Sequence, residues 1–192
     1  MMDKTVRSIP ILVVAVGMAA AVSHAAAPPA AVKGTFQSDL LAVIGDAEKK
    51  VMSLEEAVPQ NKFDWRPAPG VRSIAEAYLH IAFGNYGITR AATGKEPPAD
   101  AGWEKNRAKW DTQTTDKAAI KKILEKSFAH VHAVIGALPE ADLDKKVSFF
   151  GQDMTSRAAL MVLEGHINEH LGQEIAYART NNVTPPWSKG DK

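Results

Sequence analysis

Four stretches of the chain repeat apolar residues every three or four positions, the spacing that places side chains on one face of an α-helix. These stretches span residues 38–58, 73–93, 116–138 and 155–181. No stretch of similar length alternates with period two, and residues 147–150 form the one short strand-like segment. Four helices of about 20 residues each pack most simply side by side. The pattern therefore predicts an all-α protein, a four-helix bundle.

Residues that favour helix ends flank the predicted helices. Ser38 is a candidate N-cap of the first helix, and Ser73 with Glu76 has the Ser-x-x-Glu form of a capping box at the start of the second. The connections at residues 61–70 and 94–115 are longer than a minimal up-and-down bundle needs. We therefore expect a bundle with long loops.

The first residues resemble an export signal rather than part of a folded domain. Lys4 and Arg7 precede an apolar run at residues 9–22, and residues 23–25 fit a small-x-small cleavage site. The run is shorter than the roughly 20 residues of a membrane-spanning helix, although a retained N-terminal anchor is the alternative. We expect a periplasmic or secreted protein. The predicted parts are a signal peptide, a flexible leader and a helical bundle domain, at residues 1–25, 26–34 and 35–192.

Composition narrows the classes of function. The chain has 23 Lys and Arg against 22 Asp and Glu, so its net charge of +1 gives no electrostatic basis for binding nucleic acid. It has no cysteine, which excludes disulfides, thiolate metal ligands and a cysteine nucleophile. We expect a small-molecule substrate, no nucleic acid and no membrane span once the leader is cleaved. The sequence leaves open whether the protein forms a homodimer.

His166 and His170 are the most specific chemical feature of the chain. Residues four apart lie one above the other on a helix, so both imidazoles can point at one metal ion. At about 100° per residue, these histidines share a stripe with Gln173 and Tyr177, beside the apolar face of the last helix. That edge is where a bundle lines a ligand site. Packing histidines or a pH-sensitive patch are the alternatives.

A catalytic zinc site usually needs a third protein ligand, which here must come from another helix. His80 is favoured because its neighbours on the same side of the second helix are small. They are Ser73, Ala77, Gly84, Gly87 and Ala91. This stripe leaves two interpretations open: close packing against another helix, or open volume for a substrate around the imidazole. His130 and His132 flank the apolar stripe of the third helix and are interpreted as surface histidines.

Residues 166–170 also fit H-x-x-E-H, the inverted motif of some zinc proteases. In that arrangement Glu169 is the general base, and a third ligand follows far downstream. Only 22 residues follow His170, and none lies on a further predicted helix. Glu169 reaches the rim of the expected site rather than its floor. These features disfavour a protease.

Several spaced motifs together resemble the DinB superfamily. They are residues 63–74 with Leu79-His80-Ile81-Ala82, then Phe149-Phe150-Gly151, residues 166–173, Tyr177-Ala178-Arg179 and Pro185-Pro186. The resemblance covers about residues 35–187. It implies a four-helix bundle of unusual connectivity and a divalent metal held by His80, His166 and His170. Zn or Ni is expected, although imidazole ligands also suit Cu and Fe.

The same family includes transferases and isomerases that use low-molecular-weight thiols, and many members with no known activity. Leu171 stands where members often carry Arg, and residues 181–182 stand where Asn-Gly or Lys-Gly is frequent. An exported protein would also lack the cytoplasmic thiols of those relatives. We therefore predict a metal-dependent enzyme of transferase or hydrolase type; the alternative is a non-catalytic metal-binding or structural bundle. Its catalytic residues stay unknown, with Gln173, Glu169 and Tyr177 as candidate neighbours of the metal or substrate.

Overall fold

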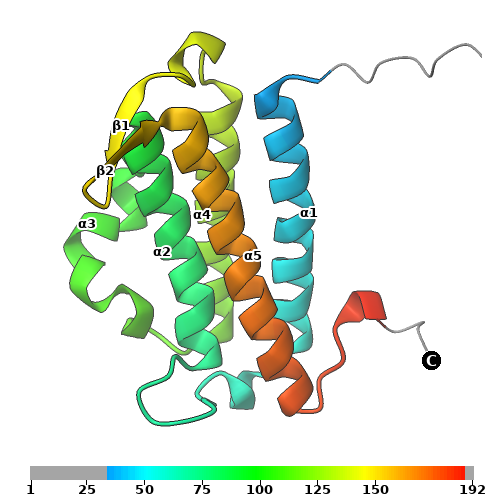
Figure 1. Cartoon of the computed structure of the whole chain (residues 1–192). Helices are drawn as coiled ribbons and strands as arrows, with labels where there is room; N and C mark the ends of the chain where they lie inside the picture. Colours follow the sequence, from blue (N-terminus) through cyan, green and yellow to red (C-terminus); the bar gives the residue numbers. More distant parts are fainter. Residues whose placement is uncertain (1–33, 189–192) are drawn as a thin grey trace, which may run out of the picture. The chain divides into compact units, whose positions relative to one another are not determined.

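The computed structural model describes residues 34–188, so the predicted signal peptide lies outside the described residues. The described residues belong to one compact unit. Its four long helices are α1 (Phe36–Ala57), α2 (Ile74–Thr93), α4 (Lys117–Gly136) and α5 (Ser156–Thr180) (Figure 1). The shorter elements used below are α3 (Trp103–Asn106), η3 (Arg107–Thr112), β1 (Lys146–Phe149) and β2 (Gln152–Thr155). The four predicted helices are confirmed, with each end shifted by two residues at most.

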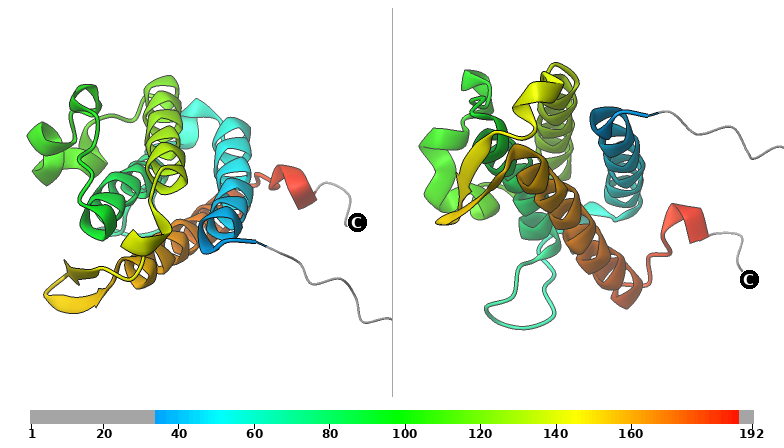
Figure 2. Two further views of the ribbon diagram at one scale, coloured as in Figure 1. Left: turned by 90° about the horizontal axis from the view of Figure 1, so that it is seen from above. Right: turned by 45° about the horizontal axis from the view of Figure 1, so that its top comes forward.

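The long helices stand at four corners of a bundle, in which α1 and α2 each pack against both α4 and α5 (Figure 2). Gln37 near the start of α1 donates a hydrogen bond to the carbonyl of Leu138 just beyond α4, so α1 and α4 run antiparallel. Helices α2 and α4 run in the same direction, and the chain between them must return along the bundle (Figure 1). This return accounts for the long connection at residues 94–116.

The connection between α4 and α5 contains a β-hairpin, which qualifies the all-α prediction. Strands β1 and β2 pair antiparallel, with Lys146 opposite Thr155 and Phe149 opposite Gln152. Phe150 and Gly151 form the turn with positive φ angles of 50° and 78°. The observed strand β1 therefore begins and ends one residue before the strand-like segment predicted at residues 147–150. Figure 1 shows the hairpin beside the end of α2 and the start of α5.

The helix starts follow the expected capping chemistry. The hydroxyl of Ser73 accepts from the backbone N–H of Glu76, and the Glu76 carboxylate accepts from the N–H of Ser73, as the capping box predicted. The N-cap of α1 is Thr35, and Ser38 occupies the third helical position of a second capping box, so the N-cap prediction for Ser38 was wrong. Within residues 34–188, no helix has the length and apolar character needed to cross a membrane.

Two carboxyl groups are buried near the C-terminal ends of α1 and α5. Glu55 on α1 and Glu174 on α5 are both 0% exposed, and their carboxyl oxygens have no hydrogen-bond partner among the described residues. Burial raises the pKa of Glu55 to about 7, and it raises the pKa of Glu174 well above its ordinary value. The fold therefore favours the neutral form of both side chains.

Glu55→Gln should make the protein more stable at pH 8 and flatten its pH dependence. The folded state binds more protons than the unfolded state between the ordinary pKa of 4.5 and about 7, so stability falls as pH rises through that window. The amide removes this loss, which is worth roughly 3 kcal/mol at pH 8. Urea unfolding at pH 4.5 and pH 8 measures the difference.

Glu56→Gln is the matched control for this substitution. Glu56 follows Glu55 on α1, is exposed and pairs with Lys121, and the hydrogen bond from Lys121 lowers the pKa of Glu56. Its replacement should change stability little. Equal pH profiles for wild type and Glu55→Gln would contradict the argument from burial.

Candidate metal centre

Three imidazole rings meet between α2 and α5. His80 comes from α2, and His166 and His170 come from successive turns of α5. One ring nitrogen from each lies within 4.8 Å of the others. The ring centroids are 5.2 Å apart for His80 and His166, 4.8 Å for His80 and His170, and 4.6 Å for His166 and His170. The structure thus brings together the three residues that the sequence singled out.

Gly84 allows the two helices to approach closely enough for this arrangement. It lies one turn after His80 on the same face of α2, and a Cβ atom at this position would overlap the imidazole ring of His166. Only glycine leaves that space, so the ring of His166 occupies the place of the missing side chain. For Gly84, the structure favours the close-packing interpretation of the small-residue stripe.

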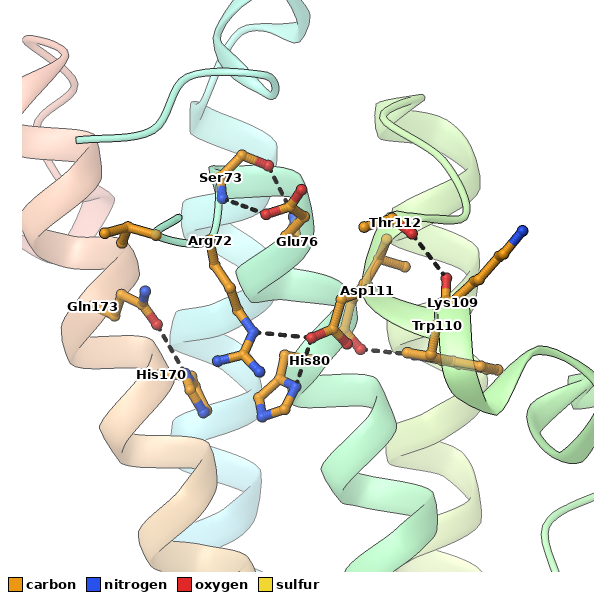
Figure 3. A network of polar contacts seen from close by, with 12 residues as sticks. Arg72, Ser73, Glu76, His80, Lys109, Trp110, Asp111, Thr112, His170 and Gln173 are labelled. Carbon is orange, nitrogen blue, oxygen red and sulfur yellow. Dashed lines mark hydrogen bonds and ion pairs between the residues drawn. The ribbon is translucent and has the colours of Figure 1, made fainter. Parts of the chain in front are cut away.

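His80 is oriented by a residue that lies outside the four long helices. Its Nδ1 lies 2.9 Å from a carboxylate oxygen of Asp111 in η3, and Arg72 Nε donates to the same oxygen over 2.9 Å (Figure 3). A carboxylate only accepts, so Nδ1 carries the hydrogen and Nε2 keeps its lone pair for a metal. Burial opposes ionisation of Asp111, but the hydrogen bonds from His80 and Arg72 outweigh it and lower the pKa of Asp111.

Asp111 and Arg72 are the site residues that the sequence analysis missed. Residues 94–115 were predicted only as a loop, and no helical periodicity indicates where such a segment lies. Trp110 anchors it: its indole ring is 2% exposed, and its Nε1 donates to the backbone carbonyl of Leu79 over 2.8 Å. The sequence carries no comparable signal for Asp111, since Trp103 is as buried as Trp110 and is also followed by an acidic residue, Glu104, that makes no contact with the cluster.

His170 is oriented from within its own helix. Its Nδ1 lies 2.8 Å from Gln173 Oε1, and Gln173 Nε2 donates to the hydroxyl of Tyr177 over 2.7 Å. The amide oxygen accepts from Nδ1–H, which again leaves Nε2 of the imidazole as the metal-binding atom. Gln173 and Tyr177 therefore hold a ring of the cluster in place. Glu169 is exposed and lies on the wall of the adjacent cavity.

His166 is partly buried, and its Nδ1 is a buried atom without a hydrogen-bond partner among the described residues. Desolvation, together with the neighbouring His170 and His80, lowers the pKa of His166 to about 3. Desolvation also lowers the pKa of His170. At neutral pH both rings are therefore uncharged, which is the form that binds a metal ion.

The two histidines of α4 lie outside this cluster. His132 Nε2 is 2.7 Å from a carboxylate oxygen of Glu48, at a half-buried position. His130 is 8% exposed, and its ring contacts that of Tyr86 at a centroid distance of 5.4 Å. The prediction of a surface position was therefore wrong for His130, because α2 covers that side of α4.

A cavity of about 670 Å³ opens beside the three imidazoles. His80, His166, Gly84, Gly87 and Ala91 line part of it, so the stripe of small residues also borders open volume. Both interpretations of that stripe hold, at different positions along α2. A cavity of this size suits a small organic molecule.

A helical bundle with a three-histidine cluster between two of its helices defines a class of protein. The family model described as the DinB superfamily matches residues 45–173, more than half of the chain, and the protein belongs to that superfamily. The resemblance noted from the sequence is thus confirmed. Comparison with curated protein sequences finds no match.

Two solved structures share the fold. A DinB-like protein from Bacillus cereus superposes with a TM-score of 0.65 at 22% identity, covering 79% of this chain and 98% of its own. A DinB-like protein from Bacillus subtilis superposes with a TM-score of 0.58 at 21% identity, covering 76% of this chain and 93% of its own. Both are similar to this chain in fold.

Gly84→Ala should destabilise the protein by about 1–3 kcal/mol, because the new methyl group must displace the His166 ring or separate the helices. Gly45→Ala is the control, since its Cβ would meet its nearest atom, His132 Cε1, at an ordinary 3.9 Å. That control should gain up to about 1 kcal/mol from helix propensity. Urea unfolding compares the two variants; equal stability changes would contradict the close approach at Gly84.

Proposed function

We propose that this protein is a metal-dependent enzyme of transferase or hydrolase type, in which His80, His166 and His170 hold a divalent transition ion. One observation carries the proposal: three imidazoles from two helices face one another, and acceptors occupy Nδ1 of two of them. Neutral imidazoles with a fixed tautomer are suited to Zn or Ni.

The number of ligands favours an enzyme over a storage or structural site. The cluster contains three potential ligands among the described residues, whereas a closed structural site takes four protein ligands. An ion held by these three residues would keep a coordination position for water or substrate, and the cavity lined by His80 and His166 would give access to it. A bound divalent ion supplies a lowered pKa for a coordinated water or substrate group.

The chain's own residues supply orientation around this position. Asp111 accepts a hydrogen bond from His80 Nδ1 and another from Arg72. The side-chain oxygen of Gln173 accepts a hydrogen bond from His170 Nδ1. These contacts fix which nitrogen faces the shared space. Glu169, on the cavity wall, is the carboxylate available to accept or return a proton at the rim.

Elemental analysis of the mature protein, purified without chelator or affinity tag, tests the metal site. We expect about one equivalent of a transition metal in the wild type, and its loss in His80→Ala and in His170→Ala, because each removes one of three ligands. His132→Ala removes a histidine that pairs with Glu48 and should retain the metal. Wild-type protein that takes up neither Zn²⁺ nor Ni²⁺ would refute the proposal and favour a structural bundle.

We also propose that residues 1–25 direct export and are removed. The positive residues, apolar run and small-x-small site of this segment support the proposal. Expression of the full chain in a bacterial host and N-terminal sequencing of the periplasmic fraction should find a first residue close to Ala26. An intact N-terminus in the membrane fraction would instead indicate a retained anchor.

A further inference from the structure

Four phenylalanine and tryptophan rings line the cavity beside the three imidazoles. Phe83 on α2 and Trp103 on α3 contribute rings with centroids 5.6 Å apart, and Phe149 and Phe150 from the hairpin contribute a second pair 4.6 Å apart. Gly87 makes room for the first pair, since a Cβ there would lie 3.1 Å from Trp103 Cζ2. These rings form an apolar pocket next to the candidate metal centre.

Phe150 is unfavourable for the fold in two respects. Its side chain is 90% exposed, and its φ of 50° lies in the left-handed region that residues with a Cβ rarely adopt. A two-residue hairpin turn with positive φ at both positions favours Asn-Gly, not Phe-Gly. The folded chain gains little from this aromatic ring, yet the ring lies on the cavity wall. A ligand that covers it would account for its presence.

Arg107 places a positive charge on the cavity wall. The guanidinium of Arg107 stacks on the ring of Trp103 with its Cζ 4.6 Å from the ring centroid. Arg107, His80 and Phe83 also border a second hollow of about 250 Å³, which Arg72 and Lys109 line. Arg107 and Lys109 form no ion pair among residues 34–188.

The other charged side chains that line the two hollows are paired, except Glu169. Asp111 is shared by Arg72 and His80, and Arg90 on the cavity wall is paired with Glu96. Glu169 is the carboxylate on the cavity wall, and it lies on α5 beside His166. An anionic group therefore finds complementary charge at Arg107 and Lys109, with the apolar walls beside it.

We propose that this cavity binds a small amphiphilic anion as the substrate of the enzyme. An aromatic or branched apolar body lies against Phe83, Trp103, Phe149 and Phe150, and an acidic group lies against Arg107. The inference rests on the proposed function in one respect, namely that the bound anion, whose body lies beside the three imidazoles, is the substrate of a metal-dependent enzyme. Binding itself requires only the aromatic walls and Arg107, so it can be measured with and without metal.

The test uses two fluorescent probes that differ by one charged group. 8-Anilino-1-naphthalenesulfonate has an apolar body and an anionic end, and N-phenyl-1-naphthylamine is its neutral analogue. We expect saturable binding of both to the mature protein, tighter for the sulfonate. Arg107→Gln should weaken binding of the sulfonate about fivefold to tenfold and leave the neutral probe within about twofold.

Phe150→Asn should weaken binding of both probes about fivefold to tenfold, because apolar contact area is lost. The same substitution should raise the midpoint of urea unfolding, since asparagine suits the left-handed turn. Met161→Ala is the matched control: Met161 is 60% exposed on α5 and does not line the cavity, so binding of both probes should stay unchanged.

Four outcomes would overturn the inference. They are absence of saturable binding, equal effects of Phe150→Asn and Met161→Ala, an Arg107→Gln effect that is the same for both probes, and sulfonate binding unaffected by Arg107→Gln. Each experiment is run on protein as purified and after loading with Zn²⁺. Probe binding with no metal uptake would refute the metal proposal alone, and metal uptake with no probe binding would refute the ligand inference alone.

Discussion

The close approach of α2 to α5 is the constraint on which the candidate site depends. Gly84 has no side chain, and the His166 ring fills the space that a Cβ would take. Because His80 lies one turn before Gly84 on the same face, the approach that accommodates His166 also brings His80 to the pair on α5. One backbone position thus sets the spacing of all three imidazoles.

The same stripe of small residues changes its effect along α2. At Gly84 the His166 ring of α5 fills the space that a Cβ would take, and at Gly87 the Trp103 ring limits it, while Gly87 and Ala91 also line the cavity. The segments between helices close this volume: Trp103 comes from the α2–α4 connection and Phe149 from the hairpin. The histidine cluster and the cavity are adjacent because the stripe of small side chains on α2 continues from the cluster to the cavity.

The long α2–α4 connection does more than join two helices that run in the same direction. Trp110 fixes it against the backbone of α2, which places Asp111 beside His80 and Arg107 on the cavity wall. A shorter connection between antiparallel helices would supply none of these groups. The unusual connectivity is therefore also what gives His80 its acidic partner and the cavity its cationic edge.

The sequence by itself determined the four helices, the Ser73–Glu76 capping box and the histidines that form the cluster. The helices, the capping box and the pairing of His166 with His170 follow from local spacing, since a helix fixes which residues share a face within a few positions. His80 was singled out by its small neighbours and by the resemblance to the DinB superfamily. Only the tertiary structure decided that Asp111 and Arg72 belong to the site, that His130 is buried and that Phe150 overhangs a cavity. These three findings depend on how the α2–α4 connection, α4 and the β-hairpin pack against α2. Such long-range packing leaves no periodic pattern in the sequence.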